Sequence, residues 1–172
     1  MSPSNNLLRL NVGFLLNAPV GDSRDFLFDI PHIHLVPDLH LNELKGTARI
    51  TRTAHGQLVQ VKMHAALPTE CVRCLTGFSQ KLDADFTELY AISHNSVTDS
   101  ELILPEDAHI DLTPLVREYM LLEIPISPLC SPECIGLCPI CGGNLNENPH
   151  EHAPDEVDPR LSILKSLLDK KE

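Results

Sequence analysis

Six cysteines and two histidines carry the chemistry that this sequence could perform, because their spacing is that of metal ligands. Two C-x-x-C pairs let both sulfurs reach one tetrahedral ion at about 2.3 Å, and the glycines after the second pair permit a tight turn. Zinc is the expected ion, since sites with four sulfur or imidazole ligands favour it. The predicted ligands are Cys71, Cys74, Cys130, Cys134, Cys138, Cys141, His150 and His152.

Eight ligands fill two four-coordinate sites, and they can be divided in two ways. The preferred division gives Cys71, Cys74, Cys130 and Cys134 to one ion, and Cys138, Cys141, His150 and His152 to the other. The second of these sets closes a loop of only about 15 residues, which costs little chain entropy. The rival division groups the two C-x-x-C pairs, Cys71 to Cys74 and Cys138 to Cys141, and leaves Cys130 and Cys134 with the histidines.

Other interpretations of the cysteines and histidines remain open. The segment Met1 to Asp25 lacks the basic stretch of a secretory signal, so we expect the reducing cytoplasm, where clustered cysteines bind metal more often than they form disulfides. A thioredoxin-like redox pair needs a βαβ setting and a helix N-terminus, which neither C-x-x-C has. The alternative for His150 and His152 is that both are solvated loop residues.

No catalytic motif competes with the metal ligands. The sequence contains no G-x-G-x-x-G, P-loop, G-x-S-x-G or H-E-x-x-H motif. We expect the pairs His32 and His34, and Asp83 and Asp85, to be ordinary surface residues. A catalytic zinc keeps a coordination position open for water, whereas both expected sites are filled by protein ligands. We therefore expect a protein that is not an enzyme and has no small-molecule substrate.

Composition narrows the partners further. The 172 residues include 13 Lys+Arg and 24 Asp+Glu, a formal net charge of −11, which excludes a general polyanion binder. No apolar run approaches the roughly 20 residues of a membrane-spanning helix, so we expect a soluble protein without a membrane partner. The basic residues expected on or near the strands are Arg49, Arg52, Lys62, Arg73 and Lys81.

The elements that must position the ligands are mostly strands. Hydrophobic residues alternate over 44–53, 57–67 and 78–90, which predicts a three-stranded antiparallel meander. Short segments at 7–12, 25–30 and 32–36 are expected to add edge strands, and 94–107 is expected to be a loop. A helix capped by Thr113, with Pro114 first and Pro125 ending it, should cover the open face through Leu112, Leu115, Val116, Tyr119 and Leu122.

The fold class predicted from these patterns is α+β: an antiparallel β-meander covered by a helix, with a zinc-knuckle segment and a short C-terminal helix. Residues 1–129 form the α+β core with the first C-x-x-C, 130–157 the metal-knuckle segment and 158–172 the C-terminal helix, as one structural domain. The knuckle segment has almost no large apolar residues after Leu145, so it is either disordered or held by something other than hydrophobic burial, and the cysteines can supply that through metal. We expect Cys71→Ala to loosen the whole domain and Cys138→Ala to disorder mainly 135–157.

The segment PISPLCSPECIGLCPICGGNLN (125–146), followed by Asp158-Pro159-Arg160, resembles the YceD family of large ribosomal RNA subunit accumulation proteins, as does the upstream Cys71-Val72-Arg73-Cys74-Leu75. The resemblance implies a non-enzymatic role in accumulation or maturation of the large-subunit (23S) ribosomal RNA in the bacterial cytoplasm, with relatives in plastids. In many members of this family the place of His150 and His152 resembles a Cys-x-Cys pair. More distant members keep ligands that resemble the first set but lack the Cys138 and Cys141 module, and this resemblance favours the preferred division.

Two functions follow as hypotheses. The first is a zinc-stabilised ribosome-assembly factor that binds pre-ribosomal large-subunit RNA or a basic ribosomal protein, and the acidic charge favours the protein. The alternative is a thiol or zinc redox switch, or a metal-responsive switch, in which loss of zinc frees thiols. Four thiolates on Zn²⁺ carry a net charge of about −2, so bound metal would make the chain more acidic still.

Overall fold

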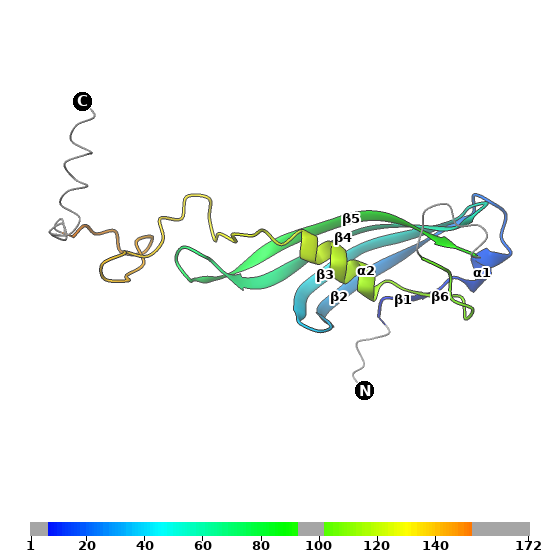
Figure 1. The fold of residues 1–172 in the computed structure, drawn as a ribbon, viewed down its shortest axis with the longest axis horizontal. Coiled ribbons are helices and arrows are strands. Elements are labelled where there is room, and N and C mark those ends of the chain that lie inside the picture. The colour runs from blue at the N-terminus through cyan, green and yellow to red at the C-terminus, as the bar shows by residue number, and fades with distance from the viewer. Residues whose placement is uncertain (1–6, 93–101, 153–172) are drawn as a thin grey trace, which may run out of the picture.

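A four-stranded antiparallel sheet of long strands dominates the computed structural model, which describes residues 7–92 and 102–152 (Figure 1). Its strands are β2 (Ser23–Leu35), β3 (Leu39–Arg52), β4 (Gly56–Glu70) and β5 (Gly77–Ala91), each paired with its neighbour in sequence. The predicted meander is therefore confirmed. Two short segments were expected where β2 runs unbroken past Pro31, which an edge strand tolerates because one side needs no partner.

The sheet has one buried and one exposed face, as the alternation predicts. Val59, Val61 and Met63 of β4 are buried, whereas Gln60 and Lys62 between them are exposed. Ala48 and Ile50 of β3 and Leu82, Ala84 and Phe86 of β5 continue the buried face. The apolar core thus lies on one side of the sheet, and the other side carries polar side chains.

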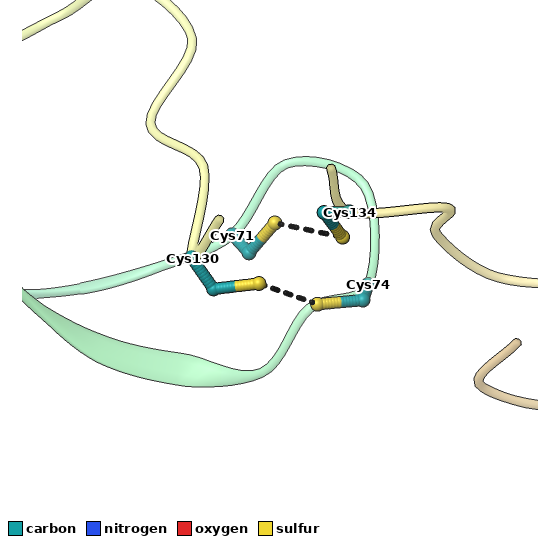
Figure 2. Close-up of side chains that lie close together, drawn as sticks. All are labelled: Cys71, Cys74, Cys130 and Cys134. Carbon is teal, nitrogen blue, oxygen red and sulfur yellow. Dashed lines mark hydrogen bonds between the residues drawn. The ribbon is translucent and has the colours of Figure 1, made fainter. Parts of the chain in front are cut away.

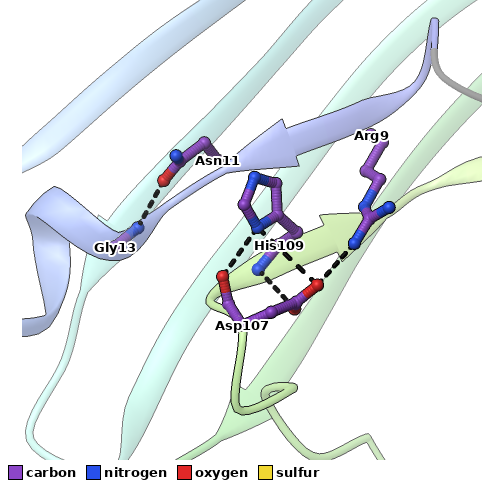
Figure 3. A network of polar contacts seen from close by, with 5 residues as sticks. All are labelled: Arg9, Asn11, Gly13, Asp107 and His109. Carbon is purple, nitrogen blue, oxygen red and sulfur yellow. Dashed lines mark hydrogen bonds and ion pairs between the residues drawn. The ribbon is translucent and has the colours of Figure 1, made fainter.

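A second, two-stranded sheet packs on the core and holds the N-terminal end of the described chain. It pairs β1 (Arg9–Asn11) with β6 (His109–Asp111), and Leu10 lies opposite Ile110 in the register. Figure 3 shows the ion pair from Arg9 to Asp107 that joins the two segments. The expectation that 7–12 adds an edge strand to the meander is wrong, because β1 finds its partner about a hundred residues later in β6. A short helix, α1 (Gly13–Leu16), follows, and the amide of Gly13 donates to the Asn11 side chain.

The longer helix α2 (Thr113–Leu122) lies over the buried face and contacts both β5 and β2 (Figure 1). It buries Leu115, Val116 and Met120. Two sequence expectations are wrong here. Leu112, not Thr113, is the N-cap residue, and the amide of Thr113 donates to the carboxylate of Asp111 at 2.9 Å. Leu122 is 78% exposed, because Met120 occupies the inward side of the last turn.

The described residues are therefore mostly antiparallel strands with two short helices, which fits the α+β class. None of the helices among residues 7–92 and 102–152 combines the length and the apolar character that crossing a membrane requires. The expected C-terminal helix (158–172) and residues 94–101 of the expected loop lie outside the described residues. The described part of that expected loop, 102–107, makes one isolated β-bridge, between Ile103 and Ala91.

Candidate metal centre

The turn between β4 and β5 presents the first pair of cysteines. Residues 71–76 close the hairpin through two backbone hydrogen bonds, from Cys71 N to Thr76 O (3.0 Å) and from Leu75 N to Cys71 O (2.9 Å). The amide of Arg73 points at the Cys71 sulfur at 3.4 Å. Leu75 takes a positive φ of 58°, which completes the reversal. The turn therefore directs both C-x-x-C sulfurs, and an amide that can stabilise negative charge on one of them, to one side.

The segment after α2 returns to this turn and brings the second pair of cysteines. The amide of Val72 donates to Pro128 O at 3.0 Å, and the amide of Leu137 donates to Arg73 O at 3.0 Å. The Arg73 guanidinium donates to the carbonyl of Cys134 at 2.8 Å. Gly136 has a φ of 95° and lies so close that an added Cβ would stand 3.1 Å from Arg73 O. Main-chain contacts therefore seat 128–137 against the hairpin.

Four sulfurs meet at this junction (Figure 2). The Cys71 and Cys134 sulfurs are 3.8 Å apart, those of Cys74 and Cys130 are 3.6 Å apart, and all four lie within 4.8 Å of one another. Disulfide sulfurs are about 2.05 Å apart, so these distances describe free thiols. Sulfurs placed tetrahedrally at about 2.3 Å from one zinc ion are about 3.8 Å apart. The spacing of the donor atoms therefore fits a zinc tetrathiolate.

The surroundings ionise some of these thiols and oppose the ionisation of others. Burial raises the pKa of Cys71, but the amides of Cys130, Cys74 and Arg73 outweigh it, and the pKa falls to about 6. The hydroxyl and amide of Thr76 lower the pKa of Cys74. The hydrogen bond to Cys74, together with burial, raises the pKa of Cys130 to about 12. A divalent cation would remove this conflict, because it allows all four thiols to ionise.

A second group lies in the loop that follows. Cys138, Cys141, His150 and His152 place one donor atom each within 4.8 Å of the others. The turn that positions the two cysteines is closed by Cys138 N to Gly143 O (2.8 Å) and Gly142 N to Cys138 O (2.9 Å). The Nε2 atom of His150 lies 3.0 Å from the Cys141 sulfur. Two thiols and two imidazoles at this spacing fit a four-coordinate ion.

The charge state of the second group also suits a metal. The amides of Cys141 and Ile140 and the ring of His150 lower the pKa of Cys138 to about 6, although burial opposes them. The Nδ1 atom of His150 lies 2.8 Å from Asn148 O, which fixes the proton on Nδ1 and leaves Nε2 free to bind. Cys141, His150 and His152 are exposed, whereas three of the four sulfurs in the first group are buried. The second group is therefore the more accessible of the two.

The structure brings together the two sets that loop closure favoured and separates the sets of the rival division. It also adds groups that spacing did not reveal. The Asn146 amide lies 3.4 Å from the Cys134 sulfur, and Arg73 holds the Cys134 carbonyl. Asn146 has no signal of its own in a polar run of asparagines. Between Cys130 and Cys134 the chain forms a simple turn, in which Cys134 N donates to Ser131 O at 3.1 Å.

The other candidates do not form a site. His32, His34, Asp83 and Asp85 are all exposed, as expected for surface residues. His32 is hydrogen-bonded to Asn42, and the ring of His34 stacks on His40.

Four of the five basic residues expected on or near the strands already bond to groups of the chain itself. Arg49 pairs with Asp25 at 2.7 Å, and Lys62 pairs with Asp85 at 2.9 Å. Arg52 donates to main-chain carbonyls of the β3–β4 turn, and Arg73 donates to Cys134. Each ion pair places a carboxylate beside the cation, so the exposed face of the sheet offers little attraction for phosphate.

Comparison with known proteins agrees with the cysteine pattern. The family model for the large ribosomal RNA subunit accumulation protein YceD matches residues 59–168, a span that contains both candidate metal groups. An uncharacterized protein of Mycobacterium tuberculosis is 36% identical over 126 residues, 70% of this chain and 59% of the relative. The uncharacterized protein YlbN of Bacillus subtilis is 34% identical over 100 residues, 57% of this chain and 58% of the relative.

A plant relative carries a functional name. The chloroplastic large ribosomal RNA subunit accumulation protein YCED homolog 1 of Arabidopsis thaliana is 35% identical over 63 residues, 37% of this chain and 20% of the relative. This chain spans 59% of the length of the mycobacterial relative it matches. No solved structure matches it. On the family match over residues 59–168, the chain belongs to the YceD family.

Proposed function

We propose that this chain is a non-enzymatic, zinc-stabilised factor that supports accumulation of the large-subunit ribosomal RNA. The observation that carries the proposal is that the region matched by the family, residues 59–168, contains every residue of the two candidate metal groups. In our proposal each group holds one zinc ion, and the ions fasten 128–152 to the β4–β5 turn. Such sites are structural, because four protein ligands leave no position for a reacting water.

We further propose that the protein acts in the cytoplasm through contact with a ribosomal component and not through catalysis. Two plant relatives are named for accumulation of the large ribosomal RNA subunit, and these names support a ribosomal component as the partner. The formal charge of −11 and the ion-paired basic residues of the sheet favour a basic ribosomal protein over bare RNA as the direct contact.

The proposal predicts a defect in one ribosomal RNA. Cells depleted of this chain should contain less large-subunit RNA relative to small-subunit RNA, measured by quantitative gel analysis of total RNA. The wild-type chain should restore the ratio, and Cys71→Ala should restore it poorly, because the knuckle segment would no longer be held. Asp29→Asn, on the exposed face of the sheet, is the matched control and should restore it fully. An unchanged ratio in depleted cells would refute the proposed function.

The two groups should also lose metal independently. The double variant His150→Ala/His152→Ala removes both imidazoles of the second group and none of the sulfurs of the first. We expect its zinc content to fall from two ions to one per chain, because two thiolates alone leave the second ion with half of its ligands. The double variant His32→Ala/His34→Ala is the control and should keep both ions. Full zinc in the His150→Ala/His152→Ala protein would show that the histidines are not ligands.

A further inference from the structure

The end of the molecule that carries both cysteine groups, here called the knuckle end (residues 71–76 and 130–152), exposes several large apolar side chains. They are Val72 (53% exposed), Leu75 (61%), Ile135 (65%) and Ile140 (57%). Scattered single apolar residues are ordinary on a protein surface. Here four of them lie on turns that backbone hydrogen bonds tie together, such as Leu137 N to Arg73 O and Leu145 N to Gly136 O. A group of this kind at one end of a molecule indicates a protein-binding surface.

A groove on the knuckle end supplies a place for one apolar side chain. It has a volume of about 490 Å³ and is lined by Ile135, Leu145, Pro149, His150 and Glu151. Two hydrogen bonds hold its walls in place. The amide of Ile135 donates to the side-chain oxygen of Asn146 at 2.9 Å, and the amide of Leu145 donates to the carbonyl of Gly136 at 3.0 Å. Three of the five lining residues are apolar and one is a carboxylate. The groove therefore suits an apolar side chain that has a cation beside it.

Apart from Arg73, the formal charges of the knuckle end are negative. The sequence from 118 to 152 contains five glutamates and no lysine or arginine. Glu133, Glu147 and Glu151 of this stretch are exposed. The nearby cation of Arg73 is directed at the Cys134 carbonyl. A surface of this kind repels the phosphates of RNA and attracts lysine and arginine.

We propose that the knuckle end is the docking surface for a basic segment of a protein partner, whose apolar side chain enters the groove while neighbouring lysines or arginines pair with Glu151 and Glu133. The proposal rests on the proposed function, since it names the class of partner through which that function is carried out. In this proposal the two metal groups also shape the groove. The segment 130–152 has too few large apolar residues to form such a groove by hydrophobic packing.

Binding of defined probes to the full zinc-loaded chain tests the docking surface. The probes are a fluorescent peptide of alternating lysine and leucine, a lysine and serine peptide, a glutamate and leucine peptide, a peptide of residues 153–172 and an oligouridine RNA. Fluorescence anisotropy at about 0.15 M salt reports affinity without exaggerating surface charge. We expect the lysine and leucine peptide to bind at least about tenfold more tightly than any other probe, because only it supplies both the apolar and the cationic contact.

Matched variants locate the site. Ile135→Ser and Glu151→Gln should each weaken binding of the lysine and leucine peptide by about tenfold, as expected for a residue central to a small interface. Leu27→Ser and Glu106→Gln remove an exposed apolar side chain and an exposed carboxylate elsewhere and should leave affinity unchanged. The zinc content of each variant is measured, so that loss of binding is not confused with loss of metal.

Several outcomes would overturn the docking proposal. They are equal binding by wild type and Ile135→Ser, tighter binding of the RNA or of the 153–172 peptide, or a dimer of the chain that Ile135→Ser dissociates. The ribosomal RNA ratio in cells carrying Ile135→Ser separates this proposal from the proposed function. A normal ratio with the variant, alongside a lowered ratio in depleted cells, would refute the docking surface alone. An unchanged ratio in depleted cells would refute the function.

Discussion

Replacing Cys71 by alanine is expected to empty the first metal group and release residues 128–137 from the β4–β5 turn, while the sheet stays folded. Cys71 is fully buried, and its sulfur lies 3.8 Å from that of Cys134. A structural zinc site contributes about 10–16 kcal/mol, so loss of one ligand in four costs about 3 kcal/mol, or more than a hundredfold in zinc affinity. The contacts from Val72 to Pro128 and from Arg73 to Leu137 would then have no metal to support them.

The structure limits how far this damage spreads. Cys71, Cys74 and Cys134 form a small cluster with Phe78 and Leu129 that is separate from the main core. The main core joins the sheet to α2 and to the β1–β6 pair and contains none of the cysteines. The expectation that Cys71→Ala loosens the whole domain is therefore narrowed to the knuckle end and the tip of the β4–β5 hairpin.

Hydrogen exchange with mass spectrometry measures this effect segment by segment. In Cys71→Ala, amides at 71–76 and 128–137 should exchange much faster than in the wild type, and those of β2 to β4 should not change. Cys138→Ala is the matched control and should accelerate exchange mainly at 135–157, leaving 71–76 and 128–134 protected. If 128–137 stayed as protected in Cys71→Ala as in the wild type, the first metal group would not be what holds this segment against the β4–β5 turn. Loss of protection throughout the sheet would show that the damage is not confined to the knuckle end.

Gly46→Ala is expected to cause a large loss of global stability. Gly46 pairs with Met63 across β3 and β4. A Cβ atom at Gly46 would lie 2.1 Å from the carbonyl oxygen of Lys62 and 2.6 Å from the Cα of Met63. Both are backbone atoms, so relief requires the two central strands to separate. Overpacking against backbone atoms costs about 3 kcal/mol, which lowers the melting temperature by roughly 10 °C in a domain of this size.

Gly77→Ala is the matched control, because Gly77 also lies in a strand but an added Cβ would meet no atom within 4 Å. Chemical denaturation of both variants, followed by circular dichroism, gives the two free energies of unfolding. We expect Gly77→Ala to stay within about 0.5 kcal/mol of the wild type, as surface substitutions usually do. Equal stability of Gly46→Ala and Gly77→Ala would show that β3 and β4 are farther apart than the structure places them.

Long alternating segments made most of the fold predictable. The runs over 57–67 and 78–90 have enough alternating residues for one buried face to define the strand. In the structure the first run lies in β4 and the second in β5. Three-residue strands carry no such pattern, so the pairing of β1 with β6 depends on packing that a local sequence does not reveal. The end of α2 differs for a related reason, since Leu122 and Met120 are both apolar and only the core decides which one is buried.

The division of the candidate ligands into two sets was predictable, because it depends on the length of chain between the ligands. The sets containing Cys130 and Cys141 follow from the short loop that the second set closes, and the structure assembles those sets. The supporting groups were not predictable, because Asn146 and Arg73 act through an amide and a carbonyl whose positions depend on the folded loop. The same holds for the groove beside Ile135, which exists only once 134–146 has folded back on itself.

Elemental analysis of the protein purified without chelator decides whether two bound metal ions hold the knuckle end together. Inductively coupled plasma mass spectrometry, normalised to protein concentration, should find two zinc ions per chain, one for each group of four donors. Chelator-treated protein should contain none and should lose hydrogen-exchange protection at 128–152 while the sheet remains protected. Protein that contains no metal as purified, yet protects 128–152 fully, would contradict the account.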